Sequence, residues 1–190
     1  MRTKIITGIL LSGICLAFAL YAVRQWRATQ RAQGETDAIE QVSSWSPVAK
    51  LVTHLMIDRH GPPQEISMHR LQWNDMGPWR RIIIQDQQPP LQQIVTYHVS
   101  AEKIDALKKF VHGPLVFPDE NELVARSDSE EINRLSLNLA NDIATGRRSP
   151  EQADRFFLRT VALHAAGKST PYMDRLLFDR PIPLVHPWEL

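Results

Sequence analysis

An uncharged run near the start of the chain constrains the fold more than any other feature. Residues 5–23 read IITGILLSGICLAFALYAV, with Arg2 and Lys4 before them and arginines at 24, 27 and 31 after them. At about 1.5 Å rise per residue, a helix of this length covers most of a roughly 30 Å hydrocarbon core while bonding its backbone groups internally. The run therefore predicts a membrane-spanning helix.

Two other interpretations of the run fit its residues less well. A cleaved signal peptide has an apolar stretch of about 7 to 15 residues that ends in small residues, whereas this run is longer and is followed directly by Arg24. A lipoprotein signal places a small residue before its cysteine, but Ile14 precedes Cys15. We therefore interpret residues 1–31 as an uncleaved anchor with basic flanks, held in the lipid bilayer by residues 5–23.

The charge changes sign between the anchor and the remaining chain. The first 31 residues hold five of the 22 lysines and arginines and none of the 21 acidic residues, so 17 basic and 21 acidic residues remain, a net charge of −4. Nucleic-acid binding requires a basic face for phosphate contacts, so we expect no nucleic-acid partner. The only cysteine lies in the anchor, which excludes a disulfide within the chain.

The rest of the chain divides into a polar connection, one domain and a proline-rich tail. Residues 32–45 are predicted to form a linker or a helix extension. Residues 46–170 suffice for one domain. Residues 171–190 contain four prolines, which favours an extended tail suited to lying on a partner.

Alternating helix and strand patterns within residues 46–170 predict an α+β fold, a small antiparallel sheet covered by helices. Ser46-Pro47 opens the first helix, and Ser149-Pro150-Glu151-Gln152 is a capping box that opens the last. Three strands are expected as a meander, followed by a separate short hairpin within residues 114–126. The expected helices are 47–60, 100–113, 127–146 and 150–167, and the expected meander strands are 65–73, 79–86 and 91–99.

Candidate chemistry in the domain is sparse. His54 and Asp58 have the spacing of two ligands on one helix face, but no third ligand lies nearby in the sequence, so we expect no metal site and a solvated helix face. His69 and His98 lie on strands of the expected meander, and two interpretations stay open for them: an acid–base pair, or two histidines at the rim of the sheet. There is no phosphate-binding glycine loop and no nucleophile motif, so neither a cofactor nor a catalytic residue is assigned.

Aromatic and cationic residues supply the candidate binding positions. Trp73 and Trp79 flank the predicted hairpin turn, where they either close a small core or form a surface with Arg80 and Arg81. Arg147 and Arg148 follow a helix end and precede a capped helix start, so they either complement the helix dipole or hold an anionic group. The candidate partner-binding residues are Trp73, Trp79, Arg80, Arg81, Arg147, Arg148, Pro183 and Trp188.

Three stretches resemble those of a family of small bacterial proteins of uncharacterised function. They follow the patterns GPPxE, RLxWxxxGPWxR and LNLAxDIxTGRRS, and lie within residues 50–165. The resemblance implies a bacterial source and one shared domain, and it implies no catalytic residues.

Together these features predict a single-pass protein of the bacterial cytoplasmic membrane. Positive charges on the two flanks of the span are nearly balanced, and the short basic N-terminus favours a domain outside the cytoplasm. We expect a non-catalytic interaction protein, an accessory or assembly subunit with a membrane-protein partner. The alternative is a membrane-tethered ligand-binding domain or small enzyme that uses His69, His98 and the surface around Trp73, Trp79, Arg80 and Arg81.

Overall fold

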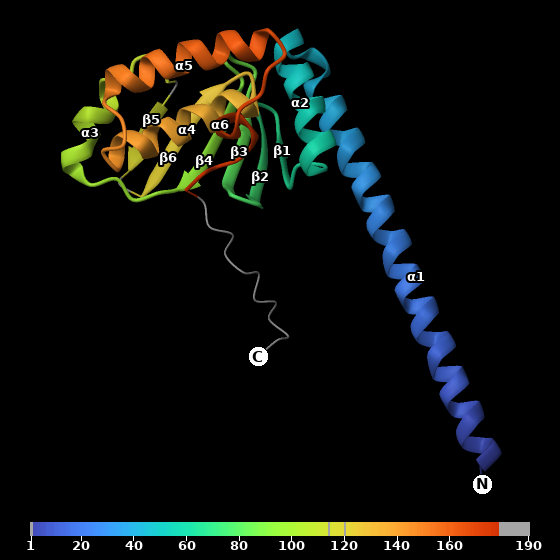
Figure 1. Cartoon of the computed structure of the whole chain (residues 1–190). Helices are drawn as coiled ribbons and strands as arrows, with labels where there is room; N and C mark the ends of the chain where they lie inside the picture. Colours follow the sequence, from blue (N-terminus) through green and yellow to red (C-terminus); the bar gives the residue numbers. More distant parts are fainter. Residues whose placement is uncertain (1, 114, 120, 179–190) are drawn as a thin grey trace.

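A six-stranded antiparallel sheet forms the centre of the folded domain in the computed structural model of the chain (Figure 1). The structure describes residues 2–113, 115–119 and 121–178, except for the side chains of residues 2–18 and 116–119. The strand order is β1-β2-β3-β4-β6-β5. The strands are β1 (Glu65–Ser67), β2 (Arg70–Met76), β3 (Trp79–Ile84), β4 (Leu91–Thr96), β5 (Leu115–Asp119) and β6 (Glu122–Ser127).

The expected antiparallel α+β fold is confirmed, but the first strand was predicted wrongly. A turn at residues 68–69 divides it into β1 and β2. The second expected hairpin joins the same sheet, because β6 pairs with β4 along six residues that include Ile94 opposite Val124 and Val95 opposite Leu123. Apolar cross-strand pairs of this kind stabilise a shared ladder.

Helices cover one face of the sheet in two layers (Figure 1). The inner layer is α4 (Glu130–Ala144), which is buried along nearly its whole length, including Leu135, Leu139 and Ile143. The outer elements α5 (Pro150–Ala165) and α6 (Pro171–Asp174) pack on α4, with α3 (Ala101–Lys108) at one end. As predicted, Ser149 caps α5 in a full capping box.

Three buried asparagines connect α4 to the layers on either side of it. Asn133 donates to Gln93 Oε1 of β4 at 3.0 Å, and Asn141 Oδ1 accepts from Tyr97 at 2.9 Å. Asn138 donates to the carbonyl oxygens of Tyr172 and Arg175 and accepts from the Leu177 amide at 2.7 Å. Residues 171–178 therefore belong to the domain, because α6, the buried side chains of Met173 and Leu176, and these bonds hold them there. The tail was expected to be extended from residue 171; its remainder, 179–190, lies outside the described residues.

A single long helix, α1 (Arg2–Gln41), leads into the domain and projects away from it (Figure 1). Residues 32–41 continue this helix, and η1 (Val42–Ser44) follows. The last turns of α1 pack against the loop after α2 (Pro47–His60): Ala38 is fully buried, and a Cβ added to Gly34 would lie 3.2 Å from Pro62 Cβ. The helix extension is thus observed where a linker was the other possibility.

Among the described residues, no helix is both long and apolar enough to cross a membrane. Most of the predicted span, residues 5–18, lies where the side chains are not described.

Helix α2 has the predicted bounds but a different buried face. Ser46 caps it and Gly61, at φ 78°, follows its end. Apolar residues recur three and four positions apart in α2 at Val48, Leu51, Val52, Leu55 and Met56, yet the buried residues are Ala49, Val52, Thr53, Met56 and Ile57. The stripe is wider than the domain can cover, so Val48, Leu51 and Leu55 remain 37%, 60% and 47% exposed.

Candidate functional sites

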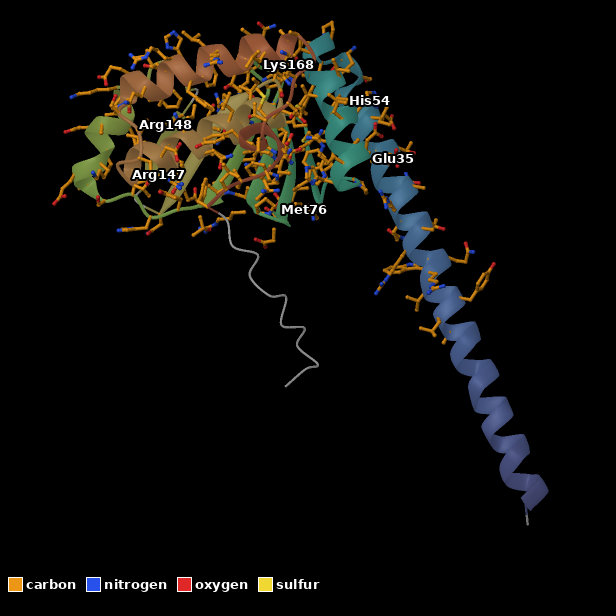
Figure 2. All side chains as sticks on the ribbon, in the orientation of Figure 1. Glu35, His54, Met76, Arg147, Arg148 and Lys168 are labelled. Atoms are coloured by element: carbon orange, nitrogen blue, oxygen red, sulfur yellow. The ribbon has the colours of Figure 1, made fainter. Side chains whose placement is uncertain are left out.

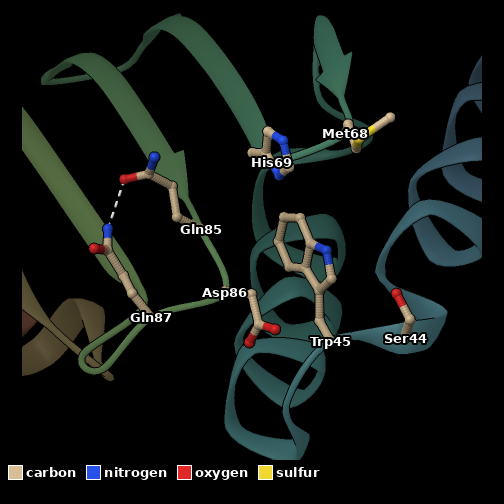
Figure 3. Close-up of a pocket in the computed structure, with 7 residues that line it drawn as sticks. All are labelled: Ser44, Trp45, Met68, His69, Gln85, Asp86 and Gln87. Carbon is tan, nitrogen blue, oxygen red and sulfur yellow. Dashed lines mark hydrogen bonds between the residues drawn. The ribbon is translucent and has the colours of Figure 1, made fainter.

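An open pocket lies between η1 and the ends of the first strands (Figure 3). It has a volume of about 470 Å³ and is lined by Ser44, Trp45, Met68, His69, Gln85, Asp86 and Gln87. His69 lies beside the Trp45 indole in Figure 3. Asp86 accepts a hydrogen bond from the Ser46 amide at 2.9 Å, and this bond lowers the pKa of the Asp86 carboxyl below its usual value. Asp86 therefore holds the start of α2, which is a structural task.

The structure does not bring His69 and His98 together. His69 precedes β2 at the end of the sheet where Leu71 pairs with Ile84 and Ile84 with Leu91. His98 follows β4 at the opposite end, where its Nδ1 lies 3.3 Å from Asn121 Oδ1. The two imidazoles lie several residues apart along the strands, and each residue of a strand spans about 3.3 Å. They therefore cannot form an acid–base pair in this structure.

His54 and Asp58 both lie on the exposed side of α2. Within the part of the chain that the structure describes, no three His, Cys, Asp or Glu side chains gather where they could hold a metal ion.

Both hairpin tryptophans are buried and serve the core. Trp73 is completely buried and donates its indole N–H to the Gly61 carbonyl oxygen at 2.8 Å. Trp79 is 1% exposed and donates to Glu130 Oε1 at 2.8 Å. The surface of tryptophans and arginines considered from the sequence is therefore absent, because the two indoles face inward.

Arg80 and Arg81 share one carboxylate on the sheet face away from α4. Arg81 Nη2 contacts both carboxylate oxygens of Glu122 at 2.7 Å, and Arg80 Nε lies 3.3 Å from the same group. The Glu122 side chain is only 6% exposed, so these arginines fasten β3 to β6 across the intervening strand β4.

A buried carboxylate, Glu130, joins three elements at the start of α4. Its side chain is fully buried. Arg59 and His60, at the end of α2, contact Oε2, while Trp79 of β3 and Arg134 of α4 contact Oε1. Burial alone would raise the pKa of Glu130, but hydrogen bonds from His60 and Arg59 and the charge of Arg134 lower it to about 2. Glu130 is therefore ionised at neutral pH and both of its carboxylate oxygens have partners, which is the arrangement of a structural ion cluster.

A second buried carboxylate, Asp142, organises the loop between α4 and α5. Its side chain is 4% exposed, and its oxygens contact Arg147 Nε at 3.0 Å and Arg148 Nε at 2.8 Å. The Tyr172 hydroxyl donates to the same carboxylate at 2.7 Å. Gly146, at φ 75°, lets the chain reverse so that both following amides bond to the Asp142 carbonyl oxygen.

Of the candidate partner-binding residues, Pro183 and Trp188 lie outside the described residues. Arg147 and Arg148 are the pair that the structure places together at a surface, 58% and 28% exposed.

Comparisons with protein-family models, curated proteins and solved structures found no match to this chain.

Proposed function

We propose that this chain is a single-pass protein of the bacterial cytoplasmic membrane that acts by contact, as an accessory or assembly subunit of a larger membrane complex. Residues 5–23 lie in the bilayer in this proposal, and the domain lies outside the cytoplasm. The observation that carries it is α1, because the predicted span and the packed residue Ala38 belong to one helix. A helix that enters the domain without a break makes a rigid support.

The length of α1 beyond the predicted span sets the distance between the domain and the bilayer in this proposal. Residues 24–41 of α1 follow the predicted span and rise about 27 Å at 1.5 Å per residue. Gly61, after the end of α2, lies near the Arg31 guanidinium, so α2 runs back along the last turns of α1. The hairpin of α1 and α2 is therefore the part of the domain that is joined directly to the predicted span.

The exposed side chains of α2 supply a contact surface on this hairpin. Val48, Leu51 and Leu55 are spaced three and four residues apart, so they form one stripe along the helix. Anchors at this spacing are typical of a helix that packs on another helix. We assign the stripe to a helix of the membrane-protein partner, which can approach at the same height.

The test is extraction of native membranes with a mild detergent, followed by native sizing and mass spectrometry of the full chain. We expect the chain to resist alkaline carbonate extraction and to co-migrate with a defined membrane protein in a fixed ratio. The double variant Leu51→Asp, Leu55→Asp is expected to lose that partner and to keep its place in the membrane. The matched control changes two exposed apolar residues elsewhere, Met68→Asp and Leu158→Asp, and is expected to retain the partner.

Two outcomes contradict the proposal. Release of the wild-type chain by carbonate refutes the anchor. A monomer or homodimer that is unaffected by the leucine changes refutes the accessory role and favours a tethered ligand-binding domain.

A further inference from the structure

Four arginines line one open groove at the end of the domain. The groove has a volume of about 520 Å³ and is bounded by Arg147 and Arg148 of the α4–α5 loop and by one side of α5. Its lining comprises Arg147, Arg148, Gln152, Arg155, Phe156 and Arg159. Figure 2 shows Arg147 and Arg148 at the end of the domain away from α1. Among the described residues, no carboxylate lines this groove, although the chain after residue 31 carries a net charge of −4.

Arg147 and Arg148 bond to Asp142 through Nε, the inner nitrogen of the guanidinium group. Both arginines use Nε for the buried carboxylate, at 3.0 and 2.8 Å. Arg148 has one further contact, from Nη2 to the Tyr172 hydroxyl at 3.4 Å. The planar fork of a guanidinium group binds phosphate through its terminal nitrogens. Asp142 thus positions two cations without occupying their forks.

Arg148 is held in place from two sides. Its guanidinium carbon lies 4.3 Å from the ring centre of Phe156 and 5.6 Å from that of Tyr172. Burial opposes its charge, but contacts with Tyr172 and Asp142 raise the pKa of Arg148 above its ordinary value. A cation fixed in this way loses little conformational entropy when it binds a ligand.

Arg155 and Arg159 complete the groove from α5, where they are one turn apart and exposed. Among the described residues, no carboxylate oxygen lies within 4 Å of either side chain. Glu151, one turn before Arg155, is bonded to the Ser149 hydroxyl at 2.6 Å and attracts Arg155 only from a longer distance. Two cations without a carboxylate partner on one side of a helix repel each other, so an anion bound between them lowers this electrostatic repulsion.

We propose that this groove binds a phosphate group, carried by a small phosphorylated molecule or by a lipid headgroup. A phosphate presents three strong acceptor oxygens and up to two negative charges, so it can engage several guanidinium groups at once, whereas a single carboxylate fits one fork. The groove has the volume of a small-molecule site. This assignment is independent of the membrane anchor and of the α2 stripe.

The test titrates the full chain in an uncharged detergent by isothermal calorimetry with two probes. Inorganic pyrophosphate represents a soluble ligand, and a short-chain phosphatidylglycerol below its micelle concentration represents a headgroup. We expect one of them to bind with one-to-one stoichiometry. The double variant Arg155→Gln, Arg159→Gln is expected to weaken that binding at least tenfold.

The control removes two positive charges outside the groove, Arg70→Gln and Lys168→Gln, and is expected to change the affinity less than twofold. Lys168 lies beyond the other end of α5 (Figure 2). Preferential binding of pyrophosphate identifies a soluble phosphate ligand, and preferential binding of the lipid identifies a headgroup. The proposal is overturned if neither probe binds, or if both double variants weaken binding equally. Circular dichroism of the variants verifies that the domain is folded.

Discussion

The buried carboxylate of Glu130 predicts a specific dependence of stability on pH. Its pKa is lowered from 4.5 to about 2 in the folded chain. A difference of this size corresponds to about 3 kcal/mol, at about 1.4 kcal/mol for each tenfold change in the proton equilibrium. Because the folded pKa is the lower one, this stabilisation is complete above about pH 5 and is lost as the pH falls toward 2.

The perturbation that isolates this effect is Glu130→Gln, which keeps the shape of the side chain and removes its charge. The new amide group replaces one acceptor oxygen and faces the donors of Arg59 or Arg134, so these contacts are lost. At pH 7 we expect the free energy of unfolding to fall by about 3 kcal/mol. Near pH 2 about half of the wild-type carboxyl groups are protonated, so the difference between the two proteins should shrink to below about 1 kcal/mol.

Urea unfolding of the full chain in detergent, followed by tryptophan fluorescence and far-ultraviolet circular dichroism, measures both quantities. The control is Glu40→Gln on the exposed side of α1, for which we expect a change within about 0.5 kcal/mol at either pH. A Glu130→Gln effect that stays constant from pH 7 to pH 2 would refute the electrostatic explanation. An effect below 1 kcal/mol at pH 7 would show that the cluster contributes little.

Three further substitutions test other contacts. Asn138→Ala should lower the free energy of unfolding by about 2–3 kcal/mol in the same urea assay, because three hydrogen bonds to residues 172–177 are lost; an unchanged unfolding midpoint would contradict this. Trp79→Phe should cost about 1–2 kcal/mol at pH 7, because Glu130 loses its indole donor, and no cost would mean that water replaces the indole. Gly34→Leu should detach α1 from Pro62 and speed trypsin cleavage after Arg31, whereas Ala32→Leu, on the exposed side of α1, should leave cleavage unchanged; equal rates in both variants would refute the packing.

Local signals in the sequence were sufficient to place two of the helix starts. Ser46-Pro47 and the Ser149–Gln152 capping box mark two helix starts, and both are observed. Such caps act over three or four residues, so the residues that make the contact are adjacent in the sequence.

The sheet was harder to predict because its pairing joins distant residues. The pairing of β4 with β6 brings together residues about 30 positions apart, and no local pattern records which strands become neighbours. The turn at residues 68–69 was missed because Met68-His69 lacks the glycine, proline or asparagine that usually indicates a turn.

The two carboxylate clusters were invisible for a related reason. In the sequence, Glu130 is one of three acidic residues near a helix start, where any exposed acid can favour the helix dipole. Three of the residues that bond to it, at positions 59, 60 and 79, lie more than fifty residues away in the sequence. The fourth, Arg134, lies one helical turn further along α4. Asp142, Arg147 and Arg148 are close in sequence. An acidic residue that shortly precedes a glycine and two arginines would have been the signal to find this cluster.

The close contact between Gly34 and Pro62 fixes the rotation of α1 about its own axis relative to the domain. Each residue in an α-helix advances the chain by about 1.5 Å and turns it by about 100°. One alanine inserted between Arg27 and Arg31 would therefore turn everything before it by more than a quarter of a revolution relative to the domain. Seven inserted residues would restore the original azimuth to within about 20° and lift the domain by about 10 Å. For a partner that contacts both ends of α1, the first insertion would rotate one contact surface relative to the other. The second insertion would increase the distance between the two surfaces.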